Sequence, residues 1–324
     1  MLELRHLRAL SAIRQGGSLV AAAERLHLTQ SALSHQIKEI EGQFDISLLH
    51  RRPLRFTPAG ERLLALADAV LPLCRDAERD IARIRGGRQG RLVMAIECHS
   101  CFEWLMPALD RFRRDWPDVE LDFAGGFRED AQDSLRQGDL DLVVTSNPGT
   151  HPDIACLPLF RYESVLLVAP DHPFADRPWI TPEDLRGETL VAYPIDPDRL
   201  DVLRYFLHPA GVEPARVRTT ELTLMAVQLA AGGRGVTALP NWAAAEFLAR
   251  GWVKAVRLGP EGVWCTLYAA VRAADRELAF LRDFLHTARD TCFATLRGIR
   301  AADSADADRQ GDPARESQRQ HQSP

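Results

Sequence analysis

Residues 17–38 carry the pattern that most limits how this chain can fold, because they spell two short helices separated by a tight turn. Ser18 and Thr29 are each placed to cap a first helical turn, since a hydroxyl there accepts from backbone N–H groups without a helical partner. Apolar side chains recur at helical spacing through both segments and predict one buried face. They are Ala22, Leu26, Ala32, Leu33, Ile37 and Ile40.

The outward face of the second helix is polar and made of short side chains. It comprises Thr29, Gln30, Ser31, Ser34, His35 and Lys38. Small hydrogen-bonding groups at the start of a second helix can reach base edges in the major groove, so we predict that these residues contact double-stranded DNA. A simple pair of helices with a solvated polar face would show the same periodicity, so the flanking sequence must decide.

The downstream sequence favours DNA binding. Arg51, Arg52 and Arg55 lie in a short apolar and basic segment that predicts a wing-like hairpin holding phosphates. Thr57-Pro58 then starts another helix, with threonine as the cap and proline at the first helical position. Two short helices followed by a basic hairpin therefore indicate a winged helix-turn-helix.

These pieces, in this order, resemble the DNA-binding domain of LysR-type transcriptional regulators. The matching motifs are Leu4-x-x-Leu7-x-x-Leu10, Ala21-Ala22-Ala23-Glu24-x-Leu26, Thr29-Gln30-x-Ala32-Leu33-Ser34 and Arg52-x-x-Arg55-x-Thr57-Pro58-Ala59-Gly60. The chain departs from the family at Ser31, where proline is frequent. The resemblance implies a DNA-binding domain over residues 1–62, an activator of transcription rather than an enzyme, and RNA polymerase as a partner.

Charge and composition agree with this interpretation. Residues 1–90 carry a net charge of +4 and residues 91–300 carry −7, as expected of a protein that touches DNA at one end. The 324 residues are enough for two or three domains. We see neither a membrane-spanning stretch nor a signal peptide, so we expect a cytoplasmic protein without a membrane partner. The six scattered cysteines predict reduced thiols.

A long apolar stripe follows the wing and predicts a helix over residues 63–88. Its members are Leu63, Leu66, Val70, Leu73, Ala77, Ile81 and Ile84. Such a stripe is either core or a seam between helices, and a helix leaving a small domain has little core of its own to cover. We therefore predict a linker helix that joins the subunits of a homodimer or homotetramer, kinked at Pro72 and ended by Gly86-Gly87.

Residues 89–300 alternate strand and helix patterns and predict an α/β fold with parallel sheets. Strands are expected at 92–96, 119–123, 140–145, 164–169, 190–193, 217–219, 236–239 and 264–271, and helices at 103–115, 130–137, 198–207, 222–231, 241–249 and 276–297. The family resemblance implies a two-lobed, periplasmic-binding-protein-like effector domain. Lobe one would hold 91–161 and 265–300, and lobe two 162–264. Residues 301–324 lack large apolar side chains and predict a disordered tail.

A small-molecule effector should bind between the lobes, beyond the carboxyl ends of the strands. Hydroxyls and N–H groups at helix starts favour a carboxylate, so the expected ligand is an anionic or zwitterionic metabolite. The candidate effector-binding residues are Glu97, His99, Ser100, Cys101, Thr145, Ser146, Tyr193, Thr223 and Leu239. No cofactor is expected.

The pair Cys98-x-x-Cys101, with His99 between the cysteines, is compatible with a metal site, a redox pair or a nucleophile with its base. No second cluster of Cys and His at suitable spacing follows, and no oriented triad can be named. We therefore interpret the segment as a polar lining of the effector loop, with no metal and no catalytic residue.

Further motifs resemble the branch of the family that activates methionine-biosynthesis genes. They are Ile96-Glu97-Cys98-His99-Ser100-Cys101, Asp171-His172-Pro173, Ile180-Thr181-Pro182-Glu183-Asp184-Leu185 and Leu267-Tyr268-Ala269-Ala270-Val271-Arg272. The resemblance implies control of genes for homocysteine methylation, including methionine synthase, with homocysteine as co-effector. Its carboxylate would face Ser100 and the 145–146 turn, and its ammonium would face Glu97. A LysR-type regulator of another metabolite, a solute-binding protein or an enzyme are the alternatives.

Overall fold

The computed structural model describes residues 2–51, 53–84, 90–97, 101–124, 131–149 and 151–302. The chain divides into two compact units, Met1–Gly86 and Gly87–Pro324. Within the described ranges, every helix is too short or too polar to cross a membrane. Only the first two residues of the predicted tail fall within the described part.

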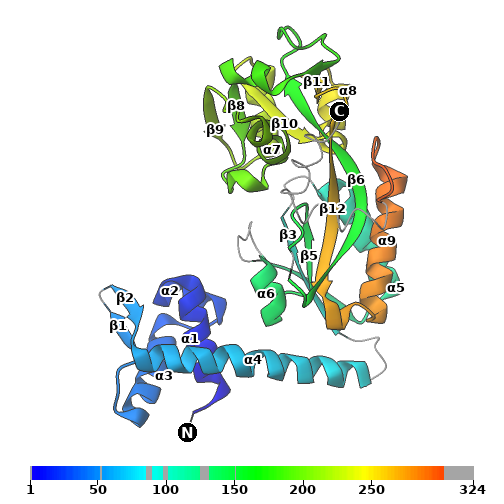
Figure 1. The fold of residues 1–324 in the computed structure, drawn as a ribbon. Coiled ribbons are helices and arrows are strands. Elements are labelled where there is room, and N and C mark those ends of the chain that lie inside the picture. The colour runs from blue at the N-terminus through cyan, green and yellow to red at the C-terminus, as the bar shows by residue number, and fades with distance from the viewer. Residues whose placement is uncertain are drawn as a thin grey trace, which may run out of the picture. The chain divides into compact units, whose positions relative to one another are not determined.

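The first unit is a winged helix-turn-helix (Figure 1). Its helices are α1 (Leu4–Gly16), α2 (Leu19–Arg25), α3 (Gln30–Phe44) and α4 (Pro58–Ile84), and its antiparallel wing consists of β1 (Leu49–Arg51) and β2 (Leu54–Phe56). Both predicted caps are confirmed. The Ser18 hydroxyl accepts from the Ala21 N–H at 3.1 Å, and the Thr29 hydroxyl accepts from the Ala32 N–H at 3.2 Å.

Helix α4 starts where the sequence predicts. The Thr57 hydroxyl accepts from the Gly60 N–H at 3.2 Å and donates to the Ser47 carbonyl at 2.7 Å, which ties the helix start to the chain before the wing. Gly60 packs directly on the backbone there, because a Cβ at this position would lie 2.2 Å from the Leu48 carbonyl oxygen. Only glycine allows this close approach without a backbone shift.

The face that α4 buries differs from the predicted stripe. The buried residues are Leu64, Ala67 and Leu71, of which Ala67 and Leu71 pack with Leu7 of α1. The small domain therefore does need this helix to complete its own core, contrary to expectation, and it uses a different side of it. Among the stripe residues whose side chains are described, four stay exposed, namely Leu66, Leu73, Ala77 and Ile81. The helix continues past Pro72, and the predicted stop at Gly86-Gly87 lies outside the described residues.

The second unit is built on a ten-stranded mixed sheet covered by helices (Figure 1). Its strands are β3 (Gly90–Ile96), β4 (Val119–Phe123), β5 (Leu142–Thr145), β6 (Ile154–Val168), β7 (Trp179–Ile180), β8 (Thr189–Ala192), β9 (Arg216–Thr219), β10 (Val236–Pro240), β11 (Lys254–Leu258) and β12 (Val263–Arg272). Its α-helices are α5 (Phe102–Asp115), α6 (Ala131–Gln137), α7 (Thr223–Ala231), α8 (Asn241–Ala249) and α9 (Ala279–Thr295). Shorter helical turns are Pro182–Gly187, Pro197–Arg199, Leu203–Leu207, His208–Ala210 and Ala273–Asp275.

The prediction of parallel sheets is confirmed within each lobe but not at the centre of this unit. Strands β3, β4 and β5 pair in parallel, as do β8, β9 and β10, but the two long strands β6 and β12 pair antiparallel. These two strands run through both lobes (Figure 1). The first half of β6 was missed because Pro158, Arg161 and Glu163 interrupt its apolar pattern. The predicted crossing positions, Arg161 and Trp264, lie within these strands.

Residues 198–207 form a 3-10 turn, Pro197–Arg199, and a π-helical turn, Leu203–Leu207, instead of the predicted continuous α-helix. Pro197 starts the first turn, and the side chain of Asp196 accepts from the Asp198 N–H at 2.9 Å. The segment thereby starts as a tight capped turn, a conformation that Asp and Pro favour.

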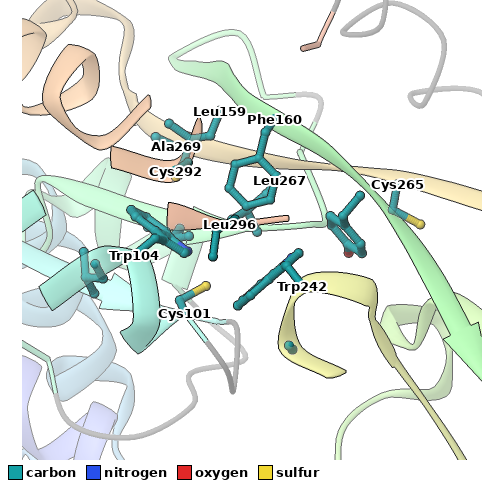
Figure 2. Packing of buried hydrophobic residues seen from close by; sticks show 14 of the residues in the cluster. Cys101, Trp104, Leu159, Phe160, Trp242, Cys265, Leu267, Ala269, Cys292 and Leu296 are labelled. Carbon is teal, nitrogen blue, oxygen red and sulfur yellow. The ribbon is translucent and has the colours of Figure 1, made fainter. Parts of the chain in front are cut away.

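The core of the second unit joins both lobes. Phe160 of β6 lies between Trp104 of α5 and Trp242 of α8, with edge-to-face centroid distances of 6.5 and 6.2 Å (Figure 2). Edge-to-face contacts of this kind add to the stabilisation from apolar burial. The two lobes therefore share one aromatic core at the crossing strands.

Candidate DNA interface and effector cleft

Helix α3 separates an apolar face from a polar one. Leu33, Ile37 and Ile40 are buried in the core of the first unit. The polar residues Thr29, Gln30, Ser31, His35 and Lys38 are exposed, and Ser34 is half-buried among them. The start of α3 therefore presents short hydrogen-bonding side chains to solvent, the arrangement needed to approach base edges.

The residue just before the wing is held to the last turns of α3 by a hydrogen bond. The Leu48 N–H donates to the Glu41 carboxylate at 2.8 Å. Arg55 lies on β2, opposite His50 in the ladder, and its side chain is exposed. Arg51 closes β1, but its side chain and all of Arg52 lie outside what the structure describes. An exposed arginine on a wing is suited to a phosphate contact.

A cleft between the lobes of the second unit encloses about 820 Å³ of space, including the solvent at its mouth. Its polar lining comprises Glu97, Ser146, Tyr162, Ser164, Tyr193, Arg199, Asp201 and Thr237. Its apolar lining includes Val191, Ala192, Ala226, Trp242 and Leu267. The cleft thus combines a few charged groups with an apolar wall, which is typical of small-molecule sites.

An ion pair crosses this cleft. An oxygen of Glu97, which follows β3 in lobe one, lies 2.6 Å from an Arg199 guanidinium nitrogen in lobe two. The Glu97 side chain is only 5% exposed and that of Arg199 15%. The second carboxylate oxygen of Glu97, Oε2, is buried and has no hydrogen-bond partner among the described residues.

A second polar cluster lies beside the ion pair. The Tyr162 hydroxyl donates to Asp201 at 2.7 Å. Burial raises the pKa of the Asp201 carboxyl and also that of the neighbouring Cys265 thiol. Because its thiolate is disfavoured, Cys265 is not a reactive nucleophile.

The predicted effector residues fall into four groups. Glu97, Ser146 and Tyr193 line the cleft. Thr223 lies next to this lining, since its hydroxyl is 2.7 Å from that of Tyr193. His99 and Ser100 lie outside the described residues.

Three further predicted residues are buried instead of lining the cleft. The Thr145 hydroxyl accepts from the Asn147 N–H at 3.0 Å and so serves the turn after β5. Leu239 packs in an apolar cluster of lobe two. Cys101 is buried at the start of α5 and is disulfide-bonded, which corrects the expectation of reduced thiols; Cys74, Cys156, Cys265 and Cys292 are free.

Sequence reasoning missed Tyr162, Arg199 and Asp201. Their neighbours in the cleft lie far away along the chain, so residue spacing gives no sign of the contact. The signal that the sequence offers is the pair of charged residues in Arg199-Leu200-Asp201. In the described part of the chain, no three His, Cys, Asp or Glu residues are placed to hold a metal ion.

Comparison with known proteins identifies both units. Residues 4–61 match the family of bacterial regulatory helix-turn-helix proteins of the lysR type, and residues 85–293 match the LysR substrate binding domain. The HTH-type transcriptional regulator MetR of Haemophilus influenzae is 46% identical over 92% of this chain and 97% of its own. MetR of Escherichia coli K12 is 45% identical over 97% of this chain and 100% of its own.

Solved structures agree. The regulatory domain of MetR, a LysR family regulator from N. meningitidis, is 40% identical, with a TM-score of 0.62 over 66% of this chain and 99% of that one. Full-length CbnR in complex with its target DNA is 23% identical, with a TM-score of 0.57 over 90% of this chain and 100% of that one, and shows the same fold.

The chain therefore belongs to the LysR family of transcriptional regulators, and it is a regulator of transcription rather than an enzyme. Regulators of this family bind DNA and form oligomers that respond to small-molecule effectors. The predicted resemblance to the MetR regulators within the family is confirmed by relatives that match it over almost their whole length.

Proposed function

We propose that this protein activates methionine-biosynthesis genes, including those for homocysteine methylation and methionine synthase, with homocysteine as its co-effector. The observation that carries the proposal is the 45–46% identity to regulators named MetR, which extends through both units. A shared DNA-binding unit alone would support only the family. Similarity across the effector domain supports the same kind of signal as well.

The cleft chemistry supports an amino-acid effector. Homocysteine carries an ammonium and a carboxylate on one carbon and a short thiol chain. The cleft offers a carboxylate, a guanidinium and hydroxyls together with an apolar wall. A ligand with both charges at one end and a weakly polar chain at the other matches that division.

The exposed stripe of α4 supports assembly through the linker helix. Leu66, Leu73 and Ile81 present apolar side chains to solvent along one long helix. A second copy of this helix would bury them, as in a helix-to-helix seam. We propose a homodimer or homotetramer that assembles through this stripe. The assembly would present two DNA-binding units to the operator and act with RNA polymerase.

The effector part of the proposal is tested by thermal unfolding of the full-length protein. A ligand that binds only the folded state stabilises it by RT ln(1 + [L]/Kd), about 2.7 kcal/mol at a hundredfold excess over Kd. We expect homocysteine to raise the melting temperature of the effector domain more than methionine does, because methionine adds an S-methyl group to accommodate. Ser146→Ala, which removes one hydroxyl from the cleft, should shrink that shift.

Two results would contradict this expectation. A larger shift with an unrelated metabolite than with homocysteine would leave a LysR-type regulator of another signal. If Ser146→Ala left the homocysteine-induced rise in melting temperature unchanged while a surface variant abolished it, the ligand would bind outside the cleft. The matched surface variant is Thr219→Val, on the exposed strand β9.

A further inference from the structure

The Glu97–Arg199 ion pair is held by well-anchored backbone on both sides of the cleft. The Glu97 N–H donates to the Val144 carbonyl at 2.9 Å, which fixes it beside the ends of β3 and β5. Arg199 closes the capped turn Pro197–Arg199, and its own N–H donates to the Asp196 carbonyl at 2.9 Å. The two charges therefore face each other from positions that each lobe sets independently.

The second oxygen of the Glu97 carboxylate is the unusual feature of this pair. Oε2 is buried, yet no hydrogen bond from the described part of the chain reaches it. A buried acceptor without a donor is costly, and native proteins rarely keep one without a reason. Because Glu97 lines the cleft, a bound molecule that opens the packing around this buried oxygen can supply the missing donor, while the other oxygen keeps Arg199 in place.

We propose that Glu97 and Arg199 together recognise the α-ammonium and α-carboxylate of an amino-acid effector. The ammonium donates to Oε2 of Glu97, and the carboxylate accepts from the Arg199 guanidinium. This assignment rests on the proposed function for its choice of homocysteine, but its chemistry applies to any α-amino acid. It assigns the carboxylate to Arg199 instead of to Thr145, whose hydroxyl already serves its own turn.

Charge balance follows from this arrangement. A zwitterion adds one positive and one negative group beside one negative and one positive side chain, so its binding leaves the net charge of the cleft unchanged. A ligand with only one of the two charges leaves a buried group without compensation, which is expensive. The effector side chain then lies toward Val191, Ala226 and Leu267, which favours an uncharged chain.

The test is calorimetric titration of the full-length protein with homocysteine and two fragments, all kept reduced. The fragment 4-mercaptobutyrate lacks the ammonium, and 3-aminopropanethiol lacks the carboxylate. Wild-type protein should bind homocysteine at least about tenfold more tightly than either, because each charged hydrogen bond lost costs about that much. Glu97→Gln should weaken homocysteine about tenfold but leave 4-mercaptobutyrate nearly unchanged. Arg199→Gln should weaken homocysteine and leave 3-aminopropanethiol nearly unchanged.

The control variant is Glu183→Gln, which breaks the exposed Glu183–Arg186 pair and should change none of these affinities. Equal binding of homocysteine by wild type, Glu97→Gln and Arg199→Gln would overturn the inference and leave the proposed co-effector intact. Tight binding of another amino acid, with the same loss in both variants, would support the inference and refute homocysteine. If a variant does not fold, the wild-type protein alone still tests the inference. Equal affinity of the wild-type protein for homocysteine and for 4-mercaptobutyrate would overturn it.

Discussion

Single residues of the DNA-binding unit divide into those placed to read bases and those placed to hold the backbone. Ser34 lies half-buried on the polar face of α3, flanked by the exposed His35. Arg55 lies on the wing, away from the helix start. Contacts to base edges carry sequence information, whereas contacts to phosphates set position and affinity. Substitutions at Ser34 and Arg55 should therefore change DNA binding in different ways, the first its specificity and the second its overall affinity.

Ser34→Ala should reduce discrimination between operator and random DNA, by about 1–3 kcal/mol if a good base contact is lost. Arg55→Ala should weaken binding to both DNAs alike and lower the salt dependence by about one phosphate contact. Fluorescence anisotropy at several salt concentrations measures both effects. An equal loss on every sequence for Ser34→Ala would show that this residue does not read bases.

Gly60 makes a prediction about stability instead of recognition. Gly60→Ala places a methyl group 2.2 Å from the Leu48 carbonyl oxygen, so the wing or the start of α4 must shift, at about 1–3 kcal/mol. Gly42→Ala is the matched control, because Gly42 lies in α3 with open space around it. Alanine there should stabilise by about 0.5–1 kcal/mol through helix propensity. Chemical denaturation of the DNA-binding domain measures the free energy of unfolding of both variants. If Gly60→Ala changed it no more unfavourably than Gly42→Ala, the close contact would be refuted.

At this scale the sequence predicts local roles well and distant partners poorly. The caps at Ser18, Thr29 and Thr57 are readable because a hydroxyl and its target N–H lie three residues apart. Arg199 and Tyr162 gain their roles only when β3, β6 and the turn at Pro197–Arg199 meet. Nothing in the residue spacing encodes that meeting.

Among the elements, α4 shows how one helix can serve two purposes. One side packs on α1. On another side, an apolar strip formed by Leu66, Leu73 and Ile81 is exposed to solvent. Leu73 is the most exposed member of this strip, at 66%. Val70 is less informative, because it also packs against the buried cluster of Leu7, Ala67 and Leu71.

Leu73→Asp should lower self-association and operator affinity together while the effector domain stays folded, because it would bury an unpaired charge in a helix seam. Sedimentation at micromolar concentration measures the association. Ala65→Asp adds the same charge to an exposed position of α4 outside the strip and should leave assembly intact. A Leu73→Asp protein that sediments like wild type would mean that the strip packs elsewhere.

Periodicity predicts short elements with one clear face and fails for long strands that change surroundings. The predicted strand at 119–123 coincides with β4, and the predicted helix at 241–249 coincides with α8. β6 was recognised only over its apolar second half. Its first half is largely half-buried and is interrupted by Pro158 and Arg161, so no continuous apolar face marks it in the sequence. The start of α4 was predicted correctly, but its buried side depends on packing against α1, which periodicity does not show.

At the scale of the whole molecule, one chain carries a DNA-binding unit and an effector unit. An effector can change DNA binding only to the extent that it binds the two functional states with different affinity. By linkage, operator DNA must then change the affinity for homocysteine by the same factor. The motif order indicates both units from sequence, whereas homocysteine itself comes from the family resemblance and the cleft chemistry alone.

The most direct measurement is footprinting of the region upstream of a methionine synthase gene with the full-length protein, with and without homocysteine. We expect protection of two half-sites separated by about one helical turn or a multiple of it, as a dimer with two reading heads requires. Homocysteine should change the extent or strength of that protection, and methionine should not. Protection no stronger than on unrelated promoter DNA, or protection indifferent to homocysteine, would contradict a methionine-pathway regulator that senses this amino acid.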